Sequence, residues 1–191
     1  IYLNKKSFLH NLEVLKNLSR KELCLVVKAN AYGHGLEWAV KNAKASGIKW
    51  FAVASVDEGI QVKKVYKESR VLLLAEPSKI QLENIKENDI DLTVYNESFI
   101  DTLIETGDEY SVHLKIDTGM HRLGCPPEKF YDLYKKIVDS DLNLIGICTH
   151  FPMADTDETE TKKSIELFEK TISDIDSTNM LLHVDNSAST L

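Results

Sequence analysis

Short apolar runs rich in β-branched residues alternate along the chain with longer segments in which apolar residues recur at helical spacing. The short runs predict strands, and the longer segments predict amphipathic helices. The predicted strands are residues 23–30, 50–55, 70–75, 92–95, 111–117, 144–150 and 181–187. The predicted helices are residues 5–18, 36–45, 57–66, 79–87 and 98–105, a helix that begins at Pro126–Pro127, and residues 158–175.

Alternation of strands and helices indicates parallel pairing, because each crossover needs a helix to return the chain. A doubly wound open sheet and a (β/α)8 barrel both satisfy this pattern. No GxGxxG follows the first strand and no GxxxxGK[ST] occurs, so the common nucleotide-binding forms of the open sheet lose their support. We therefore predict the fold class α/β, a TIM-type barrel with about seven of its eight strands in this chain.

The sequence contains no internal linker or low-complexity stretch, so residues 1–191 are predicted to form a single domain. A complete barrel of this type has about 250 residues. The chain is shorter, and it begins at Ile1 rather than at Met. We expect an incomplete barrel domain trimmed from a longer polypeptide.

Composition narrows the possible partners and the compartment. The 23 Lys and Arg residues against 30 Asp and Glu give a formal charge of −7, and this acid excess disfavours nucleic acid as a partner. No apolar run approaches the roughly 20 residues that span a bilayer, so no membrane association is expected. The three cysteines form no CxxC pair and no signal-peptide pattern opens the chain, which favours reduced thiols in the cytoplasm.

In a barrel, reacting groups gather at the C-terminal ends of the strands. The first predicted strand ends in Val26-Val27-Lys28-Ala29-Asn30, so Lys28 follows an apolar run. Such surroundings strip water from an ammonium and free its amine as a nucleophile. The alternative is a lysine whose stem lies along the barrel while its amine reaches water.

The fifth predicted strand carries an unusual row of polar residues. Alternation places His113, Lys115 and Asp117 on one face, opposite three aliphatic residues. For Lys115 and Asp117, a structural ion-pair network and a catalytic role are both open. Arg122 follows in a glycine-flanked turn, which suits a guanidinium that binds an anion or a ring oxygen.

Two further strand ends carry polar side chains. The sixth predicted strand ends at His150, which by itself more often indicates a structural histidine than a catalyst. Asn186 and Ser187 end the seventh. They are suited to donate to a phosphate, and equally suited to cap a following helix.

Four segments together resemble the alanine racemases, which use pyridoxal 5'-phosphate (PLP). They are VVKANAYGHG (26–35), HLKIDTGMHRLG (113–124), THFPMAD (149–155) and HVDNSAS (183–189). All four occur in the family's order, each at a predicted strand end. The resemblance covers effectively the whole chain and implies a PLP-binding barrel domain, without the family's C-terminal β domain.

The resemblance also implies roles for individual residues. Lys28 matches the lysine that holds PLP as a Schiff base and exchanges the α-proton on one face of the substrate. Tyr32 and Ser187 match phosphate contacts, with Asn186 beside them. Arg122 matches the arginine near the phenolic oxygen of the cofactor and the substrate carboxylate.

Two further matches concern the ring of the cofactor and the orientation of the arginine. His150 matches the histidine that packs against the pyridine ring. Lys115 matches a lysine that is often carbamylated, and its carboxylate would position Arg122. No metal site is predicted.

The same resemblance implies groups that lie beyond Leu191. These are a tyrosine from the C-terminal domain of a partner subunit, acting as second base, and an arginine facing the pyridine nitrogen. A homodimer of the full-length protein follows from that shared site.

The expected reaction is the interconversion of L- and D-alanine, which supplies D-alanine for peptidoglycan. One alternative is a racemase or decarboxylase acting on another amino acid. Another is a non-catalytic PLP-binding barrel that buffers or delivers the cofactor.

Overall fold

The computed structural model describes residues 2–184 and 186–190. These residues form two compact units, one up to Asp91 and one from Leu92 to Thr190. The seven strands follow one another in chain order. Among the described residues, no helix combines the length and the apolar character needed to cross a bilayer.

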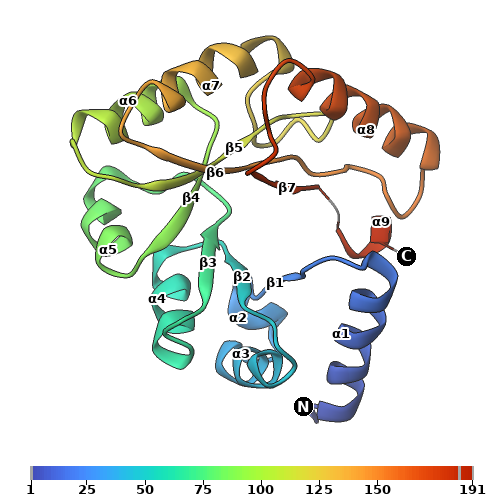
Figure 1. Ribbon diagram of the computed structural model, residues 1–191. Coiled ribbons are helices and arrows are strands. Elements are labelled where there is room, and N and C mark those ends of the chain that lie inside the picture. The colour runs from blue at the N-terminus through green and yellow to red at the C-terminus, as the bar shows by residue number, and fades with distance from the viewer. Residues whose placement is uncertain (1, 185, 191) are drawn as a thin grey trace. The chain divides into compact units, whose positions relative to one another are not determined.

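Unit 1 repeats a strand–helix step, and Figure 1 labels its α-helices and strands. Its elements are α1 (Lys5–Ser19), β1 (Cys24–Val26), α2 (Lys28–Tyr32), α3 (Leu36–Ala45), β2 (Trp50–Val53), α4 (Val56–Val65), β3 (Arg70–Leu73), η1 (Lys79–Gln81) and α5 (Leu82–Glu87).

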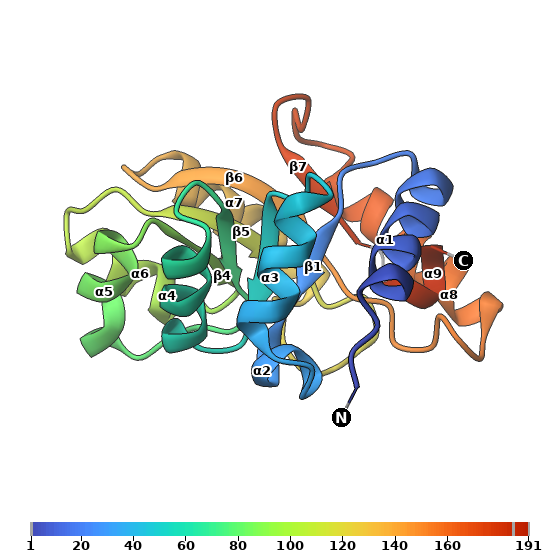
Figure 2. The ribbon, with the colours of Figure 1, turned by 90° about the horizontal axis from the view of Figure 1, so that it is seen from below.

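The sheet of unit 1 is parallel and closely covered by helices. β1 pairs with β2 and β2 with β3, and Phe51, Val53 and Val71 are fully buried. α4 contacts α3, β2 and β3, while α1 packs on the other flank of α3, as Figure 2 shows. Burial of both sheet faces explains why these strands are continuous apolar runs rather than alternating ones.

The strand β4 (Ile90–Val94) starts at the end of unit 1 and continues into unit 2. The other elements of unit 2 are α6 (Glu97–Glu105), β5 (Ser111–Lys115), η2 (Pro127–Lys129), α7 (Phe130–Val138), β6 (Asn143–Cys148), α8 (Glu158–Ile172), β7 (Leu181–His183) and α9 (Ser187–Thr190).

Unit 2 continues the parallel pattern through β4, β5, β6 and β7. Helices α6, α7 and α8 lie on the outer side of these strands (Figure 1). Asp157 begins α8 by accepting the N–H groups of Thr159 and Glu160, and Glu158 and Glu160 give the acidic first turn that favours a helix N-terminus.

All seven predicted strands are present, but each ends before its predicted last residue. Residues just past several strands still make one bond to the neighbouring strand, such as the Leu74 N–H to the Val53 carbonyl at 2.9 Å, but the regular pairing stops there. Position 185, inside the last predicted strand, lies outside the described residues.

Candidate active site

Lys28 lies just after β1 rather than within it. The predicted strand 23–30 is wrong beyond Val26. The Val27 N–H still pairs with β2, but its carbonyl accepts the N–H of Ala31 at 2.8 Å. The chain therefore leaves the sheet at Val27, and Lys28 stands half-buried at the start of a turn.

Four consecutive residues after Lys28 have left-handed backbone conformations. The φ angles of Ala29, Asn30, Ala31 and Tyr32 lie between 50° and 53°. Each L-residue in a left-handed helix costs roughly 1–2 kcal/mol, so a run of four needs contacts that hold it in place. Strain of this kind concentrates at functional sites.

Asn30 provides several of those contacts. Its Oδ1 accepts the N–H of Leu36 at 2.8 Å, at the start of α3. Its carbonyl accepts the N–H groups of Gly33 at 3.1 Å and Gly35 at 2.9 Å. The left-handed turn and the beginning of α3 are thereby joined by one network of hydrogen bonds.

Glu58, which sequence reasoning missed, holds the same turn from a distance in the chain. It lies in the first turn of α4, where its Oε1 accepts the Ala29 N–H at 2.7 Å and its Oε2 accepts the Ala54 N–H at 3.0 Å. The available signal was the S-x-x-E pattern from Ser55 to Glu58, which is typical of a helix N-terminus. That pattern does not indicate a partner in another loop.

The polar ends of Lys28 and Tyr32 are available to bind another molecule. Within the part of the chain that the structure describes, neither the Lys28 amine nor the Tyr32 hydroxyl forms a hydrogen bond or an ion pair. The Tyr32 side chain is 60% exposed. Two of the predicted site residues therefore stand on one short turn.

Asp117 orders the loop that follows β5. Its carboxylate accepts the N–H groups of Gly119 and His121, each at 3.0 Å, and its second oxygen lies 3.4 Å from the His121 ring. Burial raises the pKa of the Asp117 carboxyl, but the two N–H donors and His121 outweigh this effect and lower it. Of the two interpretations of Asp117, its contacts match the structural one.

The same loop closes at its base. The Asp117 N–H donates to the Cys125 carbonyl, and the Cys125 N–H donates to the Lys115 carbonyl, both at 2.9 Å. A Cβ at Gly124, whose φ is +136°, would lie 2.6 Å from the Asp117 nitrogen, so a side chain does not fit there. The predicted strand 111–117 is wrong after Lys115, because Asp117 pairs with this loop.

Arg122 and Lys115, on the loop after β5 and at the end of β5, differ in their exposure to solvent. Arg122 is exposed on the closed loop, and Lys115 is half-buried at the end of β5. Neither cation forms a hydrogen bond or an ion pair among the described residues. Both remain able to bind an anion.

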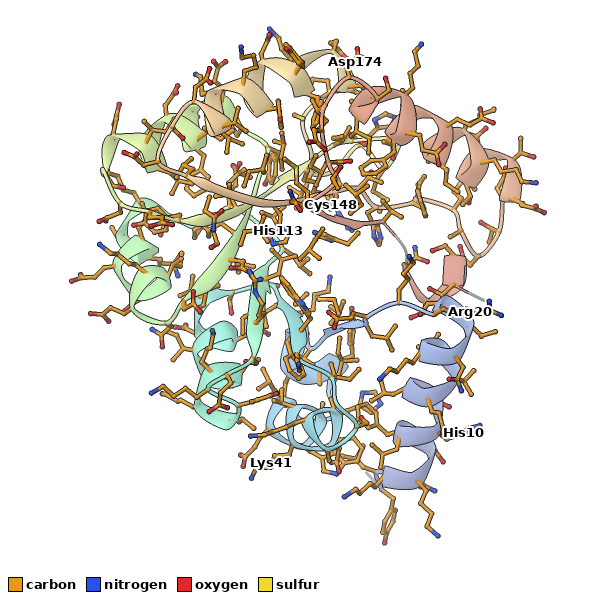
Figure 3. All side chains as sticks on the ribbon, in the orientation of Figure 1. His10, Arg20, Lys41, His113, Cys148 and Asp174 are labelled. Atoms are coloured by element: carbon orange, nitrogen blue, oxygen red, sulfur yellow. The ribbon has the colours of Figure 1, made fainter. Side chains whose placement is uncertain are left out.

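Lys115 lies opposite Cys148 in the register of β5 and β6. Burial raises the pKa of the Cys148 thiol to about 11, although the charge of Lys115 acts in the opposite direction. Cys148, labelled in Figure 3, is therefore a protonated core residue at neutral pH. Across the described ranges 2–184 and 186–190, no cluster of His, Cys, Asp and Glu side chains is arranged to hold a metal ion.

Two histidines meet across three strands of unit 2. His113 on β5, labelled in Figure 3, contacts His183 on β7 through Nδ1 and Nε2 at 2.9 Å. The contact passes over Gly146 of β6, where a Cβ would lie 2.6 Å from His113 Nδ1. Burial, then His113 and Lys115, lower the pKa of His183 to about 3, so the ring is neutral at pH 7.

His150 follows the end of β6 at a well-anchored position. The predicted strand 144–150 is wrong in its last two residues, since β6 ends at Cys148, although the Thr149 N–H still donates to the His183 carbonyl at 3.4 Å. The Thr149 hydroxyl donates to the Ile116 carbonyl at 2.9 Å and lies 2.7 Å from the Thr118 hydroxyl. These bonds tie the residue before His150 to the loop after β5.

Asn186 acts as a helix cap. Its Oδ1 accepts the N–H groups of Ala188 and Ser189, each at 3.1 Å, and its Nδ2 donates to the Phe151 carbonyl at 3.4 Å. Of the two alternatives for this residue, capping is the one that its contacts show. Ser187 is exposed in the first position of α9.

Comparisons with known proteins converge on one family. The family model described as "Alanine racemase, N-terminal domain" matches residues 3–191. The alanine racemase of Treponema denticola is 35% identical over 192 residues, which cover 94% of this chain and 51% of the relative. The chain thus spans about half the length of the curated relatives that it matches.

Solved structures show the same relationship. The alanine racemase of Clostridium difficile 630 superposes with a TM-score of 0.88 at 29% identity, covering 96% of this chain and 51% of that one. The histidine racemase of Leuconostoc mesenteroides gives a TM-score of 0.90 at 25% identity, covering 97% and 52%. The predicted α/β barrel class, with about seven of eight strands in this chain, is confirmed.

Proposed function

The chain belongs to the alanine racemase family, and on that premise we propose that it is the lysine-bearing barrel domain of a PLP-dependent enzyme that interconverts L- and D-alanine. The observation that carries this proposal is the strained turn after β1. It presents Lys28 half-buried, with an amine that has no partner among the described residues. A primary amine held in this way is suited to bind an aldehyde.

The residues present fit PLP by the chemistry of their donors. Lys28 supplies the amine for the aldehyde carbon, and the hydroxyls of Tyr32 and Ser187 are uncommitted donors for a phosphate. Arg122 supplies a guanidinium for the phenolic oxygen and for a carboxylate. His150 is proposed to pack against the ring, and Asn186, by capping α9, to hold Ser187 in place.

The reaction needs an α-proton removed from one face of an amino acid and returned to the other. The cofactor, when bound, supplies an electron sink for the developing carbanion. Lys28 takes or returns the proton on one face. Arg122 fixes the substrate carboxylate, so that the α-carbon keeps one orientation while its proton is exchanged.

Several parts of the proposal concern the whole protein rather than this chain. We place the second base, a tyrosine, outside residues 1–191, in a C-terminal domain of a partner subunit. A homodimer, a cytoplasmic location and a role in supplying D-alanine for peptidoglycan follow from the same assignment. Carbamylation of Lys115 is proposed as the means by which Arg122 is oriented.

The test is an absorbance spectrum of the intact protein with PLP, followed by borohydride reduction and peptide mapping. Covalent cofactor on Lys28, together with racemisation of L- and D-alanine, would support the proposal. Lys28→Ala should lower turnover by about a thousandfold or more, and Arg122→Ala should impair turnover more than cofactor retention.

The alternatives are separate outcomes of the same experiment. PLP held on Lys28 without racemisation of any amino acid would indicate a cofactor carrier. Faster turnover of histidine than of alanine would reassign the substrate, an arm included because of the similarity to a histidine racemase. Normal racemisation by Lys28→Ala would overturn the assignment.

A further inference from the structure

Both oxygens of the Glu58 carboxylate accept hydrogen bonds from backbone N–H groups that follow two different strands. Oε1 accepts the N–H of Ala29, the residue directly after Lys28, at 2.7 Å. Oε2 accepts the N–H of Ala54, directly after β2, at 3.0 Å. Glu58 is therefore a side-chain link between the turn that carries Lys28 and the end of the neighbouring strand.

The sequence pattern around Glu58 is one in which the glutamate side chain ordinarily caps its own helix. In a capping box, Ser and Glu three residues apart bond to each other's backbone N–H groups. Here the Ser55 side chain does accept the Glu58 N–H, at 3.3 Å. The Glu58 carboxylate does not return the bond to Ser55 but reaches Ala54 and Ala29 instead, so helix capping does not account for it.

The bond to Ala29 acts at the residue where the left-handed backbone of the turn begins. Ala29 is the first residue of this turn with left-handed φ, at 50°, and its N–H is the first donor beyond Lys28. A charge-assisted bond at 2.7 Å fixes the direction of this N–H. The peptide that it fixes joins Lys28 to Ala29, so it also restricts the direction in which the Lys28 side chain leaves the backbone.

We propose that Glu58 is a positioning residue for Lys28, holding the peptide after the lysine so that its amine meets its carbonyl partner in one orientation. This inference rests on the proposed function, in which that partner is the aldehyde of PLP. Glu58 itself touches neither cofactor nor substrate. Its effect is on the geometry of attack, where a misplacement of about 1 Å can cost about a hundredfold in rate.

The test compares Glu58→Ala and Glu58→Gln with the neighbouring control Asp57→Asn in the intact protein. Asp57 is exposed in the same first helical turn, so the control changes one charge at the same helix end. Glu58→Gln keeps the size of the side chain and one acceptor, but its amide group opposes one of the two N–H donors.

Four quantities are measured: the rate of covalent PLP attachment to Lys28 after borohydride trapping, kcat and KM for alanine, and the urea midpoint without cofactor. Glu58→Ala should slow attachment and lower kcat by about 10- to 100-fold, with KM within about twofold of wild type. Glu58→Gln should fall between Glu58→Ala and wild type, with a urea midpoint close to that of Asp57→Asn.

Wild-type attachment rates in both Glu58 variants would overturn the inference while leaving the proposed function standing. Equal losses in Glu58→Gln and Asp57→Asn would also overturn it, because the effect would then belong to the charge of the helix end. If the wild-type protein does not attach PLP at Lys28, the proposed function fails and this inference fails with it.

Discussion

The turn after β1 and the loop after β5 each present a cation at a strand end, and both contain positive φ angles. The turn achieves its conformation with four consecutive non-glycine residues, and its first N–H is held by Glu58, which is 29 positions away. The loop is held by its own Asp117, and glycine occupies positions 119 and 124. The loop is therefore encoded locally, whereas the turn depends on a residue elsewhere in the chain.

The largest effect is expected from Gly124→Ala, because it adds a side chain where the backbone of the same loop leaves no room. The new Cβ would lie 2.6 Å from a backbone nitrogen at a φ of +136°, and we expect a loss of about 2–4 kcal/mol in the free energy of unfolding. Urea denaturation measures it. Gly107→Ala is the matched control, with φ +66° and nothing within 4 Å, and a loss there as large as at Gly124 would contradict the steric explanation.

Acid should weaken the region of β5 and β7 through His183. Its pKa is lowered to about 3 in the folded chain, so between that value and the unfolded value of about 6.5 the unfolded state binds more protons. Stability is complete above the unfolded pKa and falls as pH decreases, by about 2–3 kcal/mol between pH 7 and pH 4.5.

The contribution of His183 is isolated by comparing how steeply the free energy of unfolding depends on pH in two proteins. Free energies of unfolding across this pH range are measured for wild type and for His183→Asn. The variant should be less stable than wild type at every pH because it loses packing. Its free energy of unfolding should also fall less steeply between pH 7 and pH 4.5. An unchanged slope in the variant would assign the acid sensitivity to other groups.

A smaller effect is expected in the left-handed turn itself. The Ala29 side chain is exposed, so substitutions there test backbone conformation without a change in core packing. Ala29→Val should lose about 1–2 kcal/mol of stability, because a β-branched residue tolerates left-handed φ poorly. Ala29→Gly should stay within about 1 kcal/mol of wild type, and thermal unfolding that ranks valine equal to glycine would refute this view of the turn.

The smallest effect is expected from Asp117→Asn. The amide oxygen still accepts from Gly119 and His121, and only the ionic contact with the exposed His121 ring is lost. We expect a change below about 1 kcal/mol in unfolding free energy at pH 7. Asp117→Ala removes the acceptor as well and should cost more, so equal losses in the two variants would show that the backbone bonds contribute little.

The fold was accessible from the sequence because its signals are local. The predicted strands 50–55 and 70–75 are rich in apolar and β-branched residues, and the first four residues of each form β2 and β3. The predicted helix 158–175 starts at the residue where α8 begins, and it ends three residues too late. The side-chain bond from Thr149 to the Ile116 carbonyl, just past the end of β6, joins positions 33 residues apart, so no local pattern could have indicated it.

The site was accessible only in part. Lys28 stands out by its place after an apolar run, and Arg122 by its place in a glycine-flanked turn. The left-handed turn does not stand out in the sequence, because Ala-Asn-Ala-Tyr contains no glycine, the residue that usually indicates positive φ. Glu58 and the contact between His113 and His183 depend on pairings 29 and 70 residues apart, and no local pattern carries that information.

Gly146 has a consequence for how the family can change over time. A Cβ at 146 would lie 2.6 Å from the His113 ring and also 2.6 Å from the Leu181 carbonyl oxygen of β7, so a smaller residue at 113 would not by itself make room for a side chain. In aligned relatives, glycine is therefore expected at 146 even where 113 carries a smaller side chain. Anyone redesigning this barrel would have to keep glycine at 146 or move the backbone of β7.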